Sequence, residues 1–442
     1  MRNMGLRTMK SAPLRRYLPV LVAAAVVAAG CADPQPGGDG PGLTGRTIEV
    51  LAVWSDEEQA AFERVLDVFE RRTGTTVTYV SGGDEVPTLL ATRLAGGSPP
   101  DVAGISQPAL VRTLARGGSL VPLDGATESV IDAQFAPVWK ELGTVDGELF
   151  GLLFKAANKS TVWYDAQQLG PGFTPPRTWD AFTETLRKLS DTGDTPLSVG
   201  GADGWVLTDW FENVYLQTAG GQMYDRLADH EIPWTHPSVR TALQTLGRAF
   251  RPEYLPGGAS GALHTEFTES VVDVFGSDPE ASIVYEADFV AGAIAQSTSA
   301  TVGRDARVFP FPRIGPGSSV VSGGDTLVAL TDEPGTAELM RFLASSEAAS
   351  IWAQHGGFVS PNRQVELGDY PDDTTRQIAD ELVSAENVRF DMSDLMPTAL
   401  GGIRGDGFWR AMQDYLADPT RIDEILADLE AEADAAYDGG AS

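Results

Sequence analysis

The chain is poor in cysteine, histidine and basic residues. Its 442 residues include 1 cysteine and 4 histidines, and 62 Asp and Glu outweigh 32 Lys and Arg, so the formal net charge is −30. A single cysteine excludes an internal disulfide. The sequence has no H-E-x-x-H pattern and no EF-hand loop, so we expect no metal site and no cofactor. So acidic a surface repels nucleic acid, which leaves neutral or cationic ligands.

The first thirty residues differ in kind from the rest. They contain five basic residues and no acid, and their fourteen-residue apolar run YLPVLVAAAVVAAG ends directly before Cys31. This run is too short to span a bilayer comfortably, and a basic leader before it is typical of a secretory signal. We therefore expect residues 1–30 to be a signal peptide.

The lone cysteine, Cys31, follows VAAG, and this stretch resembles the lipobox of bacterial lipoproteins, with Ala28 where leucine is usual. The resemblance implies that Cys31 is lipidated and that residues 31–45, rich in Pro and Gly, are a flexible linker. An ordinary cleaved signal with an incidental cysteine is the alternative. We expect the protein to be anchored to the cell membrane, on its extracellular or periplasmic face.

The first part of the folded chain has the pattern of a β-α-β unit. TIEVLAVW (47–54) is typical of a buried parallel strand, and TVTYV (76–80) predicts the next one. Between them, Ser55 and Glu58 have the spacing of a capping box for a helix that continues to about Arg72 and ends at Gly74. The residues after the first strand would then lie at the carboxyl end of the sheet, where open α/β sheets bind ligands.

Strands and helices continue to alternate along the chain. We expect further strands at 101–105, 281–286 and 325–330, and further helices at 84–94, from 108 to the glycines at 117 and 118, and at 336–354, 404–417 and 420–437. Alternation of this kind predicts an α/β fold whose sheets are covered by helices on both faces.

Four stretches, in order, carry a family resemblance: VLAVWSDEEQAAFERVLDVFERRTGTTVTY, RLAGGSPPDVAGISQPALVRTLARGGSLVPLD, DGELFGLLFKAANKSTVWYD and PRTWDAFTETLRKL. Together they resemble the family 1, carbohydrate-type extracellular solute-binding proteins of ABC importers, which include maltose-binding-protein-like receptors. The resemblance extends over roughly residues 46–420. It implies two α/β lobes, each a mixed sheet flanked by helices, joined by a hinge.

The resemblance also implies where the lobes divide and what the protein does. We expect an N-terminal lobe of 46–154 plus 312–358, a C-terminal lobe of 155–311 plus 359–442, and crossings near 154–156, 309–312 and 357–361. A sugar or small oligosaccharide would bind in the cleft, and closure of the lobes would deliver it to the transmembrane subunits of an ABC permease. The protein would be a monomer and not an enzyme. A ligand-sensing lipoprotein without transport is an alternative, and an extracellular glycoside hydrolase is a further one, because the many acids allow carboxylate pairs.

A sugar ring has an apolar face and a rim of hydroxyls, so flat aromatics and polar side chains should bind it. Candidates at the first strand ends are Trp54, Asp56, Asp84 and Gln107. Three of them have a structural alternative: Trp54 in the core, Asp56 as a first-turn acid and Asp84 as a helix cap.

The stretch GWVLTDWFE, at 204–212, contains two tryptophans five residues apart. At that spacing they cannot share one helix face closely, so we expect Trp205 to stack on the ligand and Trp210 to lie in the core. Asp209 is a candidate acceptor for ligand hydroxyls.

The remaining candidates lie later in the chain or at the expected first crossing. Lys155 could donate to sugar oxygens or form an ion pair. One of Tyr285, Glu286 and Asp288 should face the ligand, and Tyr285 is our choice. The other ligand-binding candidates are Asp325, Asp394 and Trp409.

Overall fold

The computed structural model describes residues 43–317 and 319–439. The predicted signal peptide at 1–30, Cys31 and most of the linker 31–45 lie outside these residues. Within the described part of the chain, no helix is both long and apolar enough to span a membrane.

A six-stranded sheet forms the centre of the first lobe. Its order is β12-β11-β3-β1-β2, and β6 also pairs with β11. β1 is parallel to β2 and β3, whereas β11 is antiparallel to β3 and β6. The strands are β1 Thr47–Ala52, β2 Thr76–Ser81, β3 Val102–Ile105, β6 Gly151–Asn158, β11 Ser319–Ala329 and β12 Asn387–Phe390.

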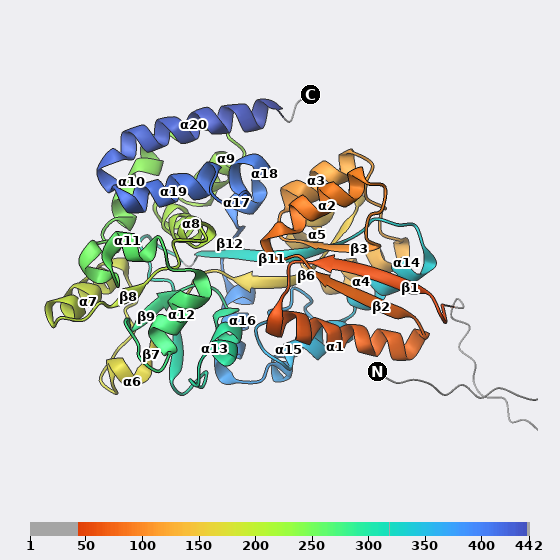
Figure 1. Cartoon of the computed structure of the whole chain (residues 1–442), viewed down its shortest axis with the longest axis horizontal. Coiled ribbons are helices and arrows are strands. Elements are labelled where there is room, and N and C mark those ends of the chain that lie inside the picture. Colours follow the sequence, from red (N-terminus) through yellow and green to blue (C-terminus); the bar gives the residue numbers. More distant parts are fainter. Residues whose placement is uncertain (1–42, 318, 440–442) are drawn as a thin grey trace, which may run out of the picture. The chain divides into compact units, whose positions relative to one another are not determined.

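Helices pack on both faces of this sheet. Figure 1 shows α1 and α15 on one face and α2 and α3 on the other. Neighbouring side chains of β1 lie on opposite faces of the sheet. Val50 packs in the core under α1, and Leu51 packs in the core under α2 and α3. The helices here are α1 Asp56–Thr73, α2 Val86–Ala95, α3 Pro108–Arg116, α4 Gly125–Gln134, α5 Pro137–Gly143, α14 Pro334–Leu343, α15 Ser346–Ala353 and α16 Asp373–Ser384, and a short hairpin pairs β4 Thr144–Val145 with β5 Glu148–Leu149.

A four-stranded sheet forms the centre of the second lobe. Its order is β10-β7-β9-β8, from the strands β7 Thr161–Asp165, β8 Leu197–Ser198, β9 Ile283–Tyr285 and β10 Ala306–Pro310. The helices of this lobe are α6 Ala166–Leu169, α7 Trp179–Asp191, α8 Trp205–Ala219, α9 Gly221–Ala228, α10 Pro237–Leu246, α11 Gly258–Ala262, α12 Phe267–Phe275, α13 Val290–Ser297, α17 Met392–Leu395, α18 Thr398–Gly401, α19 Gly407–Ala417 and α20 Ile422–Gly439. Four 3-10 turns lie at Gly83–Glu85, Pro252–Tyr254, Leu367–Asp369 and Pro419–Arg421.

The chain passes between the two sheets more than once. β6 belongs to the six-stranded sheet through Asn158, and β7 of the second sheet begins at Thr161. The first passage is therefore at Lys159 and Ser160, a few residues after the expected position, because all eight residues of β6 are buried against β11 and its neighbours. The chain returns between β10 and β11. The lobe boundaries drawn from the sequence stay a prediction.

Most of the predicted elements are confirmed, but the single helix expected at 336–354 is two helices, α14 and α15, and one capping prediction is wrong. The helix α1 does end before Gly74, which has the left-handed φ of 71°, and α3 does begin at Pro108. The capping box, however, does not form. The side chain of Ser55 makes no capping hydrogen bond and donates to Asp56 instead, while Glu58 pairs with Lys155.

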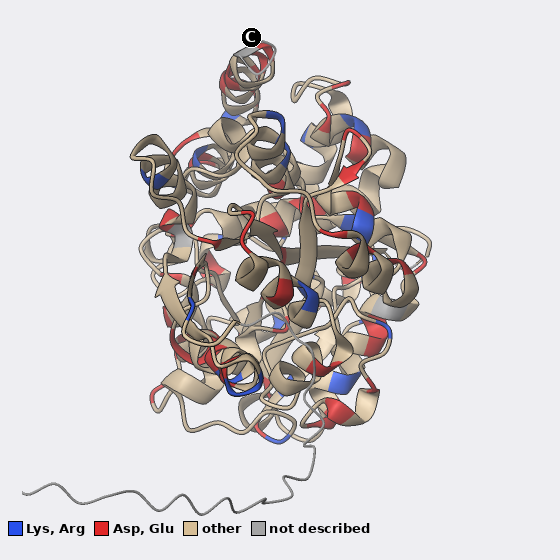
Figure 2. Ribbon diagram, turned by 90° about the vertical axis from the view of Figure 1, so that its right-hand side faces the viewer, with Lys and Arg blue, Asp and Glu red and all other residues tan. Residues whose placement is uncertain are grey.

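Charged residues are distributed over the whole molecule. On the side shown in Figure 2, acidic residues are spread along the ribbon with basic residues interspersed among them. Many of these make exposed ion pairs, such as Arg187 with Glu184 and Arg421 with Glu424. Such pairs contribute little to stability, so the excess of acids acts mainly through the net charge.

Candidate functional site

A cleft of about 550 Å³ lies between elements of the two lobes. One wall comes from the residues that follow β1 and β3 and from β6 and β11, and the other from α8, α12, α13, α17 and α19. Eight of the eleven ligand-binding residues predicted from the sequence line it: Trp54, Asp56, Gln107, Lys155, Trp205, Asp325, Asp394 and Trp409.

The first-lobe wall is built around Asp325 on β11. Trp54, which follows β1, donates from Nε1 to Asp325 Oδ2 at 2.7 Å, and Ser106, which follows β3, donates from Oγ to Asp325 Oδ1 at 2.8 Å. Trp54 is 1% exposed, and its ring packs on Phe62 and Trp352. These contacts fix the carboxyl ends of adjacent strands relative to one another before any ligand is present.

The start of α1 offers a carboxylate to the cleft. Asp56, the first residue of the helix, is exposed and has a φ of 52°, which non-glycine residues seldom adopt. Among the residues that the structure describes, its side chain accepts a hydrogen bond only from Ser55 Oγ, at 3.0 Å. A strained residue at a cleft edge points to a functional constraint, and the free acceptor capacity of Asp56 suits ligand hydroxyls.

Lys155 on β6 is buried and bound to Glu58 of α1. Burial alone would lower the pKa of Lys155, but the charges of Glu58, Asp325 and Asp288 raise it above its usual value. The ammonium group therefore stays charged. It lies in the floor of the cleft, between α1 and β11.

The second-lobe wall is aromatic. Trp205, the first residue of α8, is half-buried, with its ring centre 5.3 Å from that of Phe267 and 5.9 Å from that of Phe289. Trp409 on α19 packs against Gly204, since a Cβ added to that glycine would be 2.8 Å from the Cβ of Trp409. Together Trp205, Phe267, Phe289 and Trp409, here called the aromatic wall, line the cleft opposite Asp56 and Asp325.

The other predicted residues of GWVLTDWFE lie behind this wall. Trp210 is 0% exposed and packs in the core of the second lobe, as expected. Asp209 is also fully buried, does not line the cleft, and forms an ion pair with Lys159 at 3.0 Å. Its carboxylate therefore acts on the site through Lys159.

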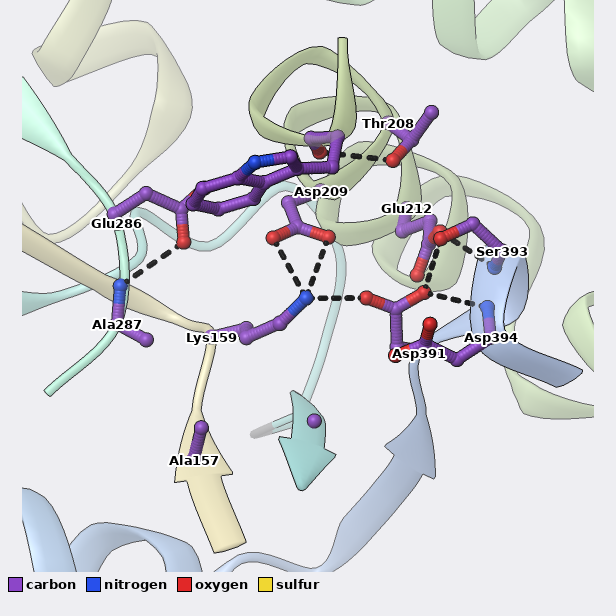
Figure 3. A network of polar contacts seen from close by, with 12 residues as sticks. Ala157, Lys159, Thr208, Asp209, Glu212, Glu286, Ala287, Asp391, Ser393 and Asp394 are labelled. Carbon is purple, nitrogen blue, oxygen red and sulfur yellow. Dashed lines mark hydrogen bonds and ion pairs between the residues drawn. The ribbon is translucent and has the colours of Figure 1, made fainter. Parts of the chain in front are cut away.

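Asp209 belongs to a buried group of carboxylates, drawn in Figure 3, that also includes Glu212, Glu286 and Asp391. Burial raises the pKa of Asp209 and of Glu212 well above their usual values, and it raises that of Glu286 to about 8. For Asp391 burial acts in the same direction, but Lys159 and Ser393 outweigh it and hold the pKa below its usual range. The charge of Lys159 opposes this effect of burial at Asp209, Glu212 and Glu286.

Glu212 has a structural part in this network. Its carboxylate accepts from the backbone N–H groups of Met392 at 2.7 Å and Ser393 at 3.0 Å, and from the hydroxyl of Tyr224 at 2.8 Å. It thereby fixes the start of α17, which presents Asp394 to the cleft. Asp209 and Glu212 do not flank the cleft, as the two carboxylates of a glycoside hydrolase would flank a substrate.

The remaining predicted residues are Tyr285 and Asp84. Tyr285 is buried and donates from its hydroxyl to the carbonyl oxygen of Lys159 at 2.8 Å. Glu286 and Asp288 are buried too, and it is Phe289 that reaches the cleft. Asp84 lies in the 3-10 turn Gly83–Glu85, and its neighbour Gly83 lines the cleft.

Sequence reasoning missed several residues that line the cleft. The main ones are Ser106, Lys159, Phe267, Phe289, Asp391 and Arg404. The predicted strand before Glu286 indicated that the residues after it approach the site, so the same reasoning could have included Phe289. Phe267 and Asp391 carry no comparable local signal, because their positions depend on how α12 and β12 pack.

Two groups of acidic and histidine side chains in the described residues have the spacing of metal ligands, namely Asp209 with Glu212 and Asp391, and His230 with Glu430 and Asp434. In the first group the ammonium of Lys159 already supplies the positive charge.

A family model described as bacterial extracellular solute-binding protein matches residues 54–350 of this chain. The osmoprotective compounds-binding protein GgtB of Synechocystis sp. is 35% identical over 399 residues, which cover 87% of this chain and 93% of that protein. The alpha-glucosides-binding periplasmic protein AglE of Rhizobium meliloti is 30% identical over 401 residues, with 87% and 86% covered.

Solved structures share the fold. The bacterial solute receptor AcbH superposes with a TM-score of 0.77 at 18% identity, covering 88% of this chain and 99% of that one. A chitin oligosaccharide binding protein gives 0.75 at 19% identity, with 88% and 98% covered. The predicted two-lobed α/β fold is thereby confirmed.

Proposed function

Because this chain belongs to the family of bacterial extracellular solute-binding proteins, whose relatives above are binding proteins and not enzymes, we propose that it binds a sugar or small glycoside in the cleft and delivers it to an ABC permease. The observation that carries the proposal is the aromatic wall facing carboxylates across the cleft. A sugar stacks its C–H face on flat rings and offers hydroxyls to carboxylate and amide groups at its rim.

Within this proposal the residues divide by what they offer. Trp205 and Trp409 supply flat surface, and Asp56, Gln107, Asp394 and Asp84 supply acceptors and donors for hydroxyls. Trp54 and Asp325 form the first-lobe wall, and Lys155 lies in the floor of the cleft. Asp209 and Tyr285 support the aromatic wall from the core of the second lobe. Small-molecule sites combine apolar and aromatic surface with placed polar groups, as this cleft does.

For the ligand we favour a neutral α-glucoside. The two relatives of 30% identity or more are named for alpha-glucosides and for osmoprotective compounds, and both align with most of this chain. Among the side chains that the structure describes, eight acids line the cleft (Asp56, Glu57, Glu58, Asp203, Glu266, Asp325, Asp391 and Asp394) against the three cations Lys155, Lys159 and Arg404. That balance disfavours an anionic ligand.

We place the protein outside the cell membrane, held by a lipid on Cys31 once the signal peptide is removed, and working as a monomer. Two relatives from Pyrococcus horikoshii are named as ABC transporter extracellular-binding proteins, which supports a permease as the partner. Closure of the lobes would mark the loaded state, and a ligand favours closure only as far as it binds the closed form more tightly.

A thermal-shift and calorimetry screen of residues 32–442 against glucose, sucrose, trehalose, maltose and longer oligosaccharides tests the proposal. A ligand present at a hundred times its dissociation constant should add about 2.7 kcal/mol of stability. We expect an α-glucoside to bind and to be recovered intact. Absence of stabilisation by every sugar in the panel would contradict the proposed ligand class.

Two matched tryptophan variants locate the binding. Trp205→Ala should weaken the affinity at least about tenfold, because buried tryptophans are frequent hot spots. Trp139→Ala, at a half-buried tryptophan of α5 that does not line the cleft, should leave the affinity unchanged. Equal losses in the two variants would place the ligand elsewhere.

A further inference from the structure

Lys159 lies where the chain first passes from one sheet to the other, and its backbone is fixed on three sides. Its N–H donates to Val321 O at 2.9 Å, and its carbonyl oxygen accepts from Asn213 Nδ2 at 2.7 Å and from the hydroxyl of Tyr285 at 2.8 Å. These partners belong to β11, α8 and β9. A side chain that starts from so well held a backbone has a defined direction.

The ammonium group of Lys159 is held just as firmly. Figure 3 shows it between the carboxylates of Asp209 and Asp391, and its Nζ is 3.0 Å from Asp209 Oδ2. Both carboxylates are almost fully buried, whereas the lysine side chain keeps 12% of its surface exposed and lines the cleft. An ammonium has three N–H donors, and the hydrogen bonds to Asp209 Oδ1 at 3.2 Å and to Asp391 Oδ2 use two of them, which leaves one for a further acceptor.

The route of the side chain depends on a glycine. A Cβ added to Gly323 would lie 2.7 Å from Lys159 Cε and 3.3 Å from Cδ, so any larger residue there would displace the lysine. With Gly323 the ammonium reaches a point 5.6 Å from the centre of the Trp205 ring. A sugar resting against Trp205 would bring its oxygens beside this ammonium.

We propose that Lys159 is a ligand-binding residue, which donates its remaining N–H to an oxygen of a glycoside that contacts Trp205. This inference rests on the proposed function. Asp209 is then a positioning residue, which holds Lys159 without touching the ligand.

The network also defines the class of ligand that Lys159 accepts. Its charge is already balanced by Asp209 and Asp391, so the site offers a directed donor without a net positive charge. Such a donor suits a hydroxyl or ether oxygen, whereas a carboxylate or phosphate would meet the adjacent Asp391 and Asp394.

The small number of lysines allows a direct test. Beyond Cys31 the sequence has four lysines, Lys140, Lys155, Lys159 and Lys188, and every element of the described fold lies within 43–439. Residues 32–442 labelled with ¹³C at the lysine Cε should therefore give four signals. Lys→Arg variants at 140, 155 and 188 assign them without altering Lys159.

Sucrose, trehalose and maltose are then added, with calorimetry on the same samples. We expect the chemical shift of the Lys159 signal to change as the protein becomes saturated with sugar. The signals of Lys140 and Lys188, which lie outside the cleft, should not shift. Calorimetric binding with an unmoved Lys159 signal would overturn this inference and leave the proposed function standing. Absence of calorimetric binding by all three sugars would overturn the proposed ligand class and this inference with it.

A pair of variants separates positioning from a merely structural role. Asp209→Asn weakens the hold on Lys159, so we expect a shifted Lys159 signal and an affinity at least about tenfold lower, although Asp209 does not line the cleft. Asp305→Asn, at another buried acid of the second lobe paired with Arg304, should change neither. An unchanged affinity and Lys159 signal in Asp209→Asn would contradict the positioning role.

Discussion

The indole of Trp54 donates a hydrogen bond of 2.7 Å to the carboxylate of Asp325, 271 residues further along the chain. Because Ser106 binds the other oxygen of the same carboxylate, Asp325 joins the ends of β1 and β3 to β11. Asp325 is only 8% exposed, so these donors replace the water that it loses on folding. The first-lobe wall of the cleft is thus held rigid by a long-range contact.

Trp54→Phe tests this contact. Phenylalanine keeps the aromatic packing on Phe62 and Trp352 but removes the donor, which leaves one oxygen of Asp325 without its partner. We expect the free energy of unfolding to fall by about 1–3 kcal/mol, the usual cost of an unsatisfied buried group. Urea unfolding measures this, with Trp139→Phe as the control. Equal losses in the two variants would show that the hydrogen bond adds nothing.

Gly204→Ala should disturb the aromatic wall. Gly204 precedes Trp205 with a φ of 78°, and an added Cβ would be 2.8 Å from the Cβ of Trp409. The left-handed conformation alone costs an L-residue roughly 1–2 kcal/mol, and the collision displaces Trp409 as well. We expect lower stability and weaker sugar binding, measured by urea unfolding and calorimetry.

The control for Gly204→Ala is Gly125→Ala, at the start of α4, where a Cβ would meet nothing within 4 Å and φ is ordinary. This variant should behave like the wild type. If Gly204→Ala did so too, the wall would tolerate a moved Trp409, and the close approach of α8 and α19 would be incidental.

Local signals explain which elements were predictable. The helix α1 has Phe62, Val65, Leu66 and Phe69 on its buried face and a glycine after its last turn, and α3 has proline at its first position. Such features act within a few residues, so sequence alone locates them. The capping box failed because Glu58 finds Lys155, a partner 97 residues away that local spacing does not reveal.

The site was predictable only in part, for the same reason. Trp54, Asp56 and Gln107 follow strands, and strand ends converge at one edge of a sheet. Asp209 was a candidate because the resembled family places this segment in the cleft, but α8 is buried on nearly every side, so the sequence could not distinguish the cleft from the core. Lys159 and Phe267 depend on the crossing and on α12, which no local pattern fixes.

Arg112 should help to hold the two lobes together. It lies on α3 of the first lobe and donates from Nη2 to the carbonyl oxygen of Leu395 on α17 at 2.8 Å. Burial lowers its pKa, which indicates that this cation has lost water on packing against the second lobe. A hydrogen bond from a charged group contributes about 1.5–3 kcal/mol, so Arg112→Ala should weaken the binding of every ligand by roughly tenfold or more.

The measurement is calorimetry with several sugars. Loss of a contact outside the cleft should lower the affinity for every sugar by the same factor and leave the order of the affinities unchanged. Arg116→Ala is the matched control, since Arg116 lies one turn along the same helix, is 62% exposed and pairs only with exposed Asp146. A changed order of affinities would mean that Arg112 acts on the ligand itself.

Glu286 should make stability depend on pH. It is fully buried, its Oε2 accepts from Ala287 N at 3.1 Å, and its Oε1 finds no hydrogen-bond donor among the residues described. Burial raises its pKa to about 8 from an ordinary 4.5. Between those values the folded protein keeps a proton that the unfolded chain has released, so stability falls as the pH rises through this window and levels off above it.

Glu286→Gln removes this titration, because glutamine is neutral at every pH. The free energy of unfolding of the variant relative to the wild type should therefore increase from pH 4.5 to pH 8, by at most about 1.4 kcal/mol per unit for one proton. Asp288, whose pKa burial raises to about 6, titrates in both proteins and cancels in that difference. Glu141→Gln, which removes a carboxyl group that is exposed in the folded protein, is the matched control. A constant difference for Glu286→Gln would mean that Glu286 is already ionised in the folded protein, and that Lys159 then balances its charge as well as those of Asp209 and Asp391.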